Sequence, residues 1–165
     1  MTNVPFKIDY NGEWFYHGTI INRKSIIKLF SSVLVVDNDG TYHLRTPVED
    51  CLVEVEDVPF IINRVQVLNK GGKQIIIFTT NLEDKIELGK HHPLWMREKK
   101  YSGELIPYVL VSRGIEARVS RNVYYDLVEY LERVKKGNKK IEGIASNKLF
   151  FPLDKKSSPG DWIKI

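Results

Sequence analysis

The sequence predicts an α+β fold, in which two amphipathic helices pack on a mostly antiparallel sheet. Three observations lead to this prediction. Two segments carry apolar residues at a helical period, most of the remaining chain consists of short apolar or alternating runs between turn residues, and the order of these elements repeats. A chain of 165 residues with 42% hydrophobic residues can bury one compact core.

Apolar residues at helical spacing predict helices over residues 26–34 and 123–134. The first stripe consists of Ile26, Ile27, Leu29, Phe30, Val33 and Leu34. The second stripe consists of Val123, Tyr124, Leu127, Val128, Leu131 and Val134. We expect the turn residues 37–40 to end the first helix and Gly137 to end the second.

Short strands are predicted for most of the remainder. Asn11-Gly12 stands between two apolar runs and is typical of the type I′ turn of a hairpin. Cys51, Val53 and Val55 alternate with glutamates, as expected of a strand with one buried face. Further strands are expected at residues 60–68, 74–78, 85–88, 106–111, 115–119, 141–145 and 149–153.

The order of the predicted elements repeats, because a hairpin, a helix and a second hairpin occur once in the first part of the chain and again near its end. The helix starts match as well, since Arg23 and Arg121 both follow a small polar residue at the start of a helix. We therefore predict two degenerate hairpin–helix–hairpin repeats, residues 1–70 and 71–153, within one compact unit. Residues 154–165, rich in Lys, Ser, Pro and Gly, are expected to form a mobile tail.

The net charge of +4 is small, because 21 acidic side chains offset most of the 25 basic ones. Basic residues nevertheless cluster at residues 97–100, 135–140 and 155–156. We favour a solvated surface for these clusters and expect no nucleic-acid partner. The alternative is a patch that follows a phosphate backbone, which requires the clusters to lie on one face with aromatic side chains between them.

The sequence also bears on cellular location. No apolar run approaches the roughly 20 residues of a membrane-spanning helix, and the first residues lack the apolar core of a secretory signal. Cys51 is the single cysteine, so no disulfide is expected. We predict a cytoplasmic protein without a membrane partner.

Motifs of catalytic, metal and cofactor sites are missing from the sequence. The four histidines, His17, His43, His91 and His92, lack the spacing of a zinc site. Cys51 is expected to pack as a small core residue rather than to act as a nucleophile, and no serine lies in a G-x-S-x-G motif. We predict no metal and no cofactor, and favour a protein that is not an enzyme.

Two arginines are placed against the local electric field. Arg23 and Arg121 are each expected in the first turn of a helix, where the helix dipole makes a cation unfavourable. An ion pair with Glu49, Asp57 or Glu116 explains this placement, because the guanidinium binds carboxylates through two parallel hydrogen bonds. The alternative is an anion pocket, in which helix N–H groups and the guanidinium bind a phosphate or carboxylate ligand.

Two acidic residues lie close to prolines at predicted strand ends. Glu49 follows Thr46-Pro47, and Asp57 precedes Pro59. Structural roles are favoured for both acids, such as hydrogen bonds from turn amides to Asp57.

Further residues match a known pattern, and the match runs from about residue 6 to residue 153. The matching positions in the first half are Trp14 to Gly18, Ile21 to Arg23, Leu29-Phe30, Leu34, Asp39-Gly40, Tyr42, Leu44, Thr46-Pro47, Glu49 and Val55 to Phe60. Those in the second half are His92 to Leu94, Pro107 to Val109, Arg113, Glu116-Ala117 and Arg121. In these residues the chain resembles the bacterial domain of unknown function 1285. The resemblance implies a two-repeat α+β fold, a bacterial cytoplasmic setting and a role in regulation or signal transduction, and it supplies no catalytic residues.

The leading functional hypothesis is a non-enzymatic regulatory module that binds a small anionic ligand or a protein partner. Its site is a cleft between the two repeats, lined by the candidate residues Arg23, Glu49, Asp57, Arg113, Glu116 and Arg121. One alternative is a hydrolase-type enzyme that uses Glu49 and Asp57 in acid–base catalysis and the arginines to bind an anionic group. The other is nucleic-acid binding through the lysine clusters.

Overall fold

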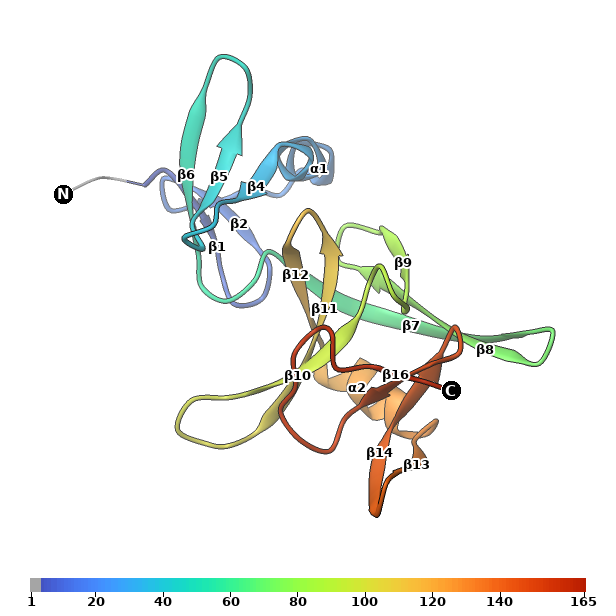
Figure 1. Cartoon of the computed structure of the whole chain (residues 1–165). Helices are drawn as coiled ribbons and strands as arrows, with labels where there is room; N and C mark the ends of the chain where they lie inside the picture. Colours follow the sequence, from blue (N-terminus) through green and yellow to red (C-terminus); the bar gives the residue numbers. More distant parts are fainter. Residues whose placement is uncertain (1–3) are drawn as a thin grey trace.

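The structure is a computed structural model and describes residues 4–165. Within that range the chain forms sixteen β-strands and two short helices, α1 (Lys24–Ser32) and α2 (Arg121–Val128) (Figure 1). The strands are β1 (Phe6–Ile8), β2 (Trp14–Tyr16), β3 (Thr19–Ile20), β4 (Leu34–Val36), β5 (Tyr42–Arg45), β6 (Asp50–Val55), β7 (Phe60–Lys70), β8 (Lys73–Thr80), β9 (Lys85–Glu87), β10 (Leu94–Glu98), β11 (Leu105–Ser112), β12 (Ile115–Val119), β13 (Glu132–Lys136), β14 (Lys139–Ser146), β15 (Leu149–Pro152) and β16 (Ile163–Lys164). The predicted α+β class is therefore wrong, and the fold is mostly β.

The first sheet contains β1 to β6 in the order β3-β2-β1-β6-β5-β4. β1 and β2 pair in antiparallel register around the predicted Asn11-Gly12 turn, where Gly12 has a φ of 80°. This confirms the hairpin, but the predicted type I′ turn is wrong, because Asn11 does not have the positive φ that this turn requires and the pairing of Ile8 with Trp14 leaves a longer loop. At the centre of the sheet β1 pairs with β6 in parallel, with Ile8 beside Val55. We call this sheet, together with α1, the N-terminal unit.

The second sheet contains β7 to β12 in the order β10-β11-β12-β7-β8-β9. β7 and β12 pair in parallel at its centre, with Ile62 beside Val119. Read from β9 to β10, the six strands follow the same order as those of the first sheet. In each sheet the strand that comes first in the sequence pairs in parallel with the strand that comes last, and the other pairs are antiparallel. We call this sheet, together with α2 and β13 to β16, the C-terminal unit; the two units lie at opposite ends of Figure 1.

The predicted hairpin–helix–hairpin repeat is wrong, because what the two sheets share is their strand order and not the position of a helix. α1 lies between the third and fourth strands of the first sheet, whereas α2 follows the last strand of the second sheet. Arg23 and Arg121 therefore do not occupy equivalent places. The similar sequences at the two helix starts suggested the repeat, but strand pairing determines the architecture. The boundary predicted after residue 70 falls at the turn between β7 and β8.

Both helices are shorter than predicted. α1 ends at Ser32, and the apolar residues that follow form β4, so that residues 37–40 are the turn of the β4–β5 hairpin. α2 ends at Val128, and Val134 lies in β13 opposite Ile141 of β14. Leu131 and Val134 fit a helical period, but pairing with β14 decides the conformation of this segment. None of the helices within residues 4–165 has the length and apolar character needed to cross a membrane.

The third sheet has the order β13-β14-β15-β16 and packs against the second. Ser146 joins the two, because its buried hydroxyl accepts a hydrogen bond from the Ile76 N–H at 2.9 Å and donates to the Leu88 carbonyl at 2.7 Å. One continuous apolar core connects all three sheets and includes Trp14, Phe78 and Phe151.

A close approach between β14 and β15 requires glycine at residue 143. A Cβ added there would collide with the Phe151 carbonyl oxygen and would lie 2.8 Å from the Phe150 ring. We expect Gly143→Ala to lower the free energy of unfolding by about 2–3 kcal/mol, since the core cannot absorb an extra methyl group without moving the strand.

Urea denaturation measures this effect, and Gly160→Ala is the matched control because no atom lies within 4 Å of a Cβ added there. Equal stability of the two variants would contradict the close approach.

Candidate functional site

The buried side chain of Arg118 joins the two units. Its Nη1 donates to Asp57 Oδ2 at 2.8 Å, and its Nη2 donates to the Tyr10 carbonyl at 2.6 Å. The guanidinium carbon also lies 3.6 Å from the centroid of the Tyr10 ring, which is cation–π distance. Tyr10 belongs to the turn between β1 and β2, Asp57 to the linker after β6, and Arg118 to β12. One side chain thus connects both units and the linker.

Asp57 has a second partner in the C-terminal unit. The Tyr108 hydroxyl donates to both carboxylate oxygens, at 2.9 and 3.1 Å. Burial, followed by the neighbouring Asp57 charge, raises the pKa of Tyr108, so this phenol remains a donor at neutral pH. Asp57 therefore accepts hydrogen bonds from a guanidinium and from a phenol instead of from the amides of its own turn.

Two recesses lie at the junction, and the Arg118–Asp57 pair contributes one member to each. The tyrosine recess, about 430 Å³ in volume, is lined by Arg118 together with Tyr10, Lys99, Arg121, Tyr124 and Tyr125, among others. The acidic recess, about 720 Å³, is lined by Asp57 together with Tyr42, Glu54 and Glu116, among others. Both units contribute to both recesses.

The tyrosine recess includes the start of α2. Ser120 caps the helix, because its hydroxyl accepts from the Val123 N–H at 3.4 Å. Arg121 follows and donates to Glu104 at 3.0 Å, and this pair is exposed, with 68% and 44% of the two side chains accessible. Partial burial raises the pKa of Tyr124. The recess therefore presents the cation of an exposed ion pair beside the neutral phenol of Tyr124.

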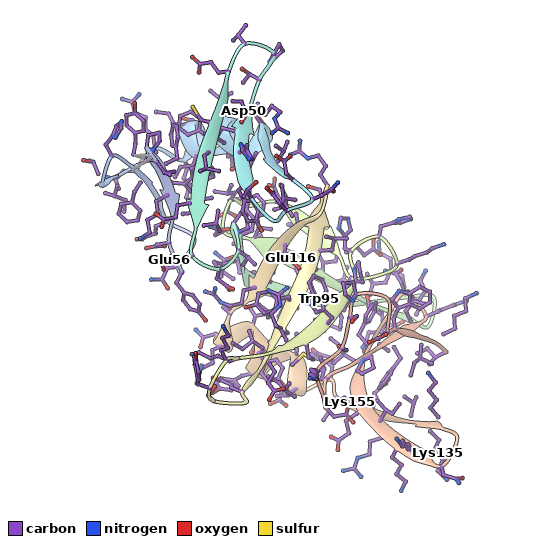
Figure 2. The ribbon with its side chains drawn as sticks, turned by 60° about the vertical axis from the view of Figure 1, so that its left-hand side comes forward. Asp50, Glu56, Trp95, Glu116, Lys135 and Lys155 are labelled. Atoms are coloured by element: carbon purple, nitrogen blue, oxygen red, sulfur yellow. The ribbon has the colours of Figure 1, made fainter. Side chains whose placement is uncertain are left out.

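The acidic recess is partly neutralised by Arg97. The Arg97 guanidinium donates to Glu116 at 2.9 Å and stacks on Tyr108, with 4.0 Å between its carbon and the ring centroid. The Trp95 ring centroid lies 5.9 Å from the same guanidinium carbon; Figure 2 shows Glu116 and Trp95 near the middle of the molecule. Burial, with a further contribution from the Glu116 charge, raises the pKa of Tyr42 to about 12.

The structure brings together two of the six predicted site residues, Asp57 and Glu116, in the acidic recess. Arg121 lies in the tyrosine recess instead. Arg23 precedes α1 as its N-cap residue.

The remaining two predicted residues lie in turns. Arg113, between β11 and β12, donates to the Ser32 carbonyl at 3.4 Å. Glu49 is exposed in the turn between β5 and β6. The two arginines at the helix starts therefore line no common recess at the junction, and the predicted gathering of all six residues does not occur there.

The sequence interpretation missed Arg118, Tyr108 and Tyr10, the other members of the junction. A charged residue between Ala117 and Val119 in an apolar strand was the available signal, since a buried guanidinium requires an acidic partner. Asp57, already singled out, is that partner.

The proposed acid–base pair of the hydrolase alternative is widely separated. Glu49 and Asp57 lie beyond opposite ends of β6, a six-residue strand that spans about 20 Å. Asp57 also accepts three hydrogen bonds, two from the Tyr108 hydroxyl and one from Arg118, which leaves it poorly suited to remove a proton from a substrate.

A second polar cluster lies on the turn between β4 and β5, on β5 and at the start of β6. His43 Nε2 is 3.0 Å from the Thr41 hydroxyl, and His43 Nδ1 is 2.8 Å from Asp50, an order that resembles a nucleophile, a base and an acid. However, the Thr41 hydroxyl donates its proton to Asp39 at 2.6 Å. The Thr41 hydroxyl thus has a carboxylate as its acceptor, and these side chains form a hydrogen-bonded network at the surface. Among residues 4–165, no group of three His, Cys, Asp or Glu side chains is arranged to hold a metal ion.

Arg45 completes this cluster. It donates to Asp37 at 3.0 Å and to Asp50 at 2.8 Å, and these hydrogen bonds hold the pKa of both carboxyl groups below the usual value of 3.8. Folding thus favours the ionised carboxylates.

The Arg118–Asp57 pair should dominate the stability of the junction. We expect Arg118→Met to lower the free energy of unfolding by about 3–5 kcal/mol, because it leaves a largely buried carboxylate without its charged partner. The exposed pair gives the matched control, and Arg121→Met should cost less than about 1 kcal/mol. Chemical denaturation of both variants measures the difference. Similar losses in the free energy of unfolding would show that Arg118 does not hold the two units together.

The Arg45 cluster should make stability depend on acid pH. Because the folded pKa values of Asp37 and Asp50 lie below the unfolded ones, their contribution is complete above about pH 5 and is lost as the pH falls through the folded values. Thermal unfolding should show a decline of the melting temperature between about pH 5 and pH 3 that is shallower in Arg45→Met. Arg133→Met, at another exposed pair, should keep the wild-type slope. An unchanged slope in Arg45→Met would refute this assignment.

Comparisons with known protein families divide the chain between the same two units. Residues 1–58 match the N-terminal domain of DUF1285, described as a domain of unknown function, and residues 59–153 match the C-terminal domain of the same family. The border lies in the linker between β6 and β7. No curated protein matches the sequence.

Two solved structures are similar to this one. A DUF1285 family protein from Silicibacter pomeroyi is 37% identical, with a TM-score of 0.81, over 92% of this chain and 80% of that protein. A DUF1285 family protein from Shewanella baltica is 29% identical, with a TM-score of 0.57, over 76% of this chain and 91% of that protein. The chain therefore belongs to DUF1285, a family of proteins of unknown function.

Proposed function

We propose that this protein is a non-enzymatic binding module that holds a small anionic ligand in the tyrosine recess. The observation that carries the proposal is the composition of this recess, in which Arg121 and Lys99 lie with three tyrosines at the junction of the two units. A volume of about 430 Å³ suits a small organic ligand.

The charges of the recess favour an anion. Glu104 is the acidic residue of its lining, against Lys99 and Arg121, while the charge of Arg118 is paired with Asp57. The Arg121–Glu104 pair is exposed and contributes little to stability, so a ligand carboxylate or phosphate can replace Glu104 at small cost. N–H groups of the first turn of α2 add partial positive charge at the same place.

The aromatic side chains favour a ligand with a flat or apolar part. Tyr10, Tyr124 and Tyr125 supply ring surface, and their hydroxyl groups can donate hydrogen bonds. An anionic ligand with a planar ring, such as a nucleotide or an aromatic acid, combines the two properties.

A ligand in this recess contacts both units, since Tyr10 belongs to one and Arg121 to the other. Binding therefore stabilises the junction and can change how firmly the units are held together. A regulatory role in bacterial signalling and a cytoplasmic setting form part of this proposal.

Thermal unfolding in the presence of a panel of nucleotides and organic acids tests it. A ligand at about 100 times its Kd adds about 2.7 kcal/mol of stability, which raises the melting temperature by about 5–10 °C for a chain of this size. Arg121→Ala should abolish this rise. Arg113→Ala is the matched control, because Arg113 is also exposed and lies outside the recess, and it should keep the full rise.

The proposal fails if no member of the panel stabilises the wild-type protein. It fails equally if Arg113→Ala reduces the rise as much as Arg121→Ala, since ligand binding would then depend on net charge alone.

A further inference from the structure

The three basic clusters of the sequence converge in the folded chain. Two adjoining recesses of about 800 and 420 Å³ lie between the β10–β11 loop, the β13–β14 hairpin and the C-terminal segment. Residues of the cluster 97–100 line the larger recess, and residues of the cluster 135–140 line the smaller one. Lys156, from the cluster 155–156, lines both recesses. We call their common surface the basic groove. Its lysines are Lys99, Lys100, Lys136, Lys139, Lys155 and Lys156.

The segment between the two recesses is held in place by hydrogen bonds. The Ser157 N–H donates to the Met96 carbonyl at 2.9 Å, and the Ser157 hydroxyl accepts from the Met96 N–H at the same distance. Asp161 accepts from the Ser158 N–H at 2.8 Å. Residues 154–165, expected to form a tail, thus carry Lys155 and Lys156 to the other two clusters. Figure 2 shows Lys135 and Lys155 at the same end of the molecule.

The positive charge of the basic groove is largely uncompensated. Its lining holds seven basic side chains, the six lysines and Arg97, against the two acidic ones of Glu98 and Asp161. Within residues 4–165 the lysine ion pairs are Lys7–Glu56, in the N-terminal unit, and Lys24–Glu83, which joins the two units. None of the six groove lysines forms an ion pair within residues 4–165, and they outnumber the two acidic side chains of the lining, so an external polyanion would relieve their mutual repulsion.

Aromatic side chains lie among these lysines. Tyr101, at the tip of the β10–β11 loop, is fully exposed, with 100% of its surface accessible. Trp162 lines the smaller recess and is partly exposed. Exposed rings between cations are suited to stacking with unpaired bases. A ligand that offers only phosphate groups gives these rings no stacking partner.

We infer that the basic groove binds single-stranded nucleic acid, with lysines on the phosphates and Tyr101 stacked on a base. Its concave form favours a flexible single strand over a rigid duplex or a flat membrane. The inference is independent of the ligand in the tyrosine recess, although Lys99 borders both sites. It also meets the condition that the sequence could not test, namely that the clusters share one face with aromatic residues between them.

Fluorescence anisotropy with a labelled oligothymidylate of about 20 nucleotides tests the inference. If four phosphates are contacted, the wild-type Kd should rise about 50-fold between about 50 and 200 mM salt. A variant with glutamine in place of Lys136, Lys139, Lys155 and Lys156 should bind at least tenfold more weakly at the lower salt concentration, with most of the salt dependence gone.

The matched control removes the same charge elsewhere. Glutamine in place of Lys28, Lys70, Lys85 and Lys90, which are all exposed and lie outside the groove, should leave the Kd within about twofold of wild type. Since all eight positions are exposed, both variants should melt near the wild-type temperature. Tyr101→Ala should weaken binding at least fivefold, and Tyr101→Phe should restore it.

Three results would overturn the inference. The first is no binding of the oligonucleotide by the wild-type protein at low salt. The second is an equal loss in the groove and control variants, which would indicate diffuse attraction by the net charge. The third is tighter binding to a duplex of the same length, or to vesicles rich in anionic lipid, than to the single strand.

Discussion

The guanidinium group of Arg118 holds three parts of the chain in one arrangement. It is almost completely buried, and water cannot replace the carboxylate and carbonyl that it contacts. A planar group with several fixed donors can bind Asp57 through one nitrogen and the Tyr10 carbonyl through another. The linker therefore leaves β6 in a defined direction, and the second sheet begins where the first ends.

Both recesses at the junction follow from this arrangement. Each is bordered by one member of the Arg118–Asp57 pair, and each takes further side chains from both units. A recess built from two sheets changes its shape whenever the sheets move relative to each other. The shapes of the two recesses and the orientation of the units are thus physically coupled.

The sequence predicted much of the local structure. Apolar alternation and turn residues located the Asn11-Gly12 hairpin and most strands of the second sheet, because these signals arise between neighbouring residues. It failed where distant pairing decides the outcome. Val134 fits a helical stripe, yet it lies in a strand because β14 is available beside it.

The candidate site was predictable to a smaller extent. Asp57, Glu116 and Arg121 do lie at the junction, since charged residues close to apolar ones require partners. The parallel pairing of β7 with β12 brings Arg118 to Asp57, 61 residues away in the sequence, and no local pattern records such a contact. The meeting of the three lysine clusters has the same cause.

The hydrogen bonds between Ser157 and Met96 have a consequence for solubility. β10 is the outermost strand of the second sheet on its side, and its outer backbone groups would otherwise be free to pair with a strand of another molecule. The C-terminal segment covers part of this margin with its own backbone. Loss of that cover would expose a template for intermolecular strand addition, so these residues protect the folded chain against aggregation.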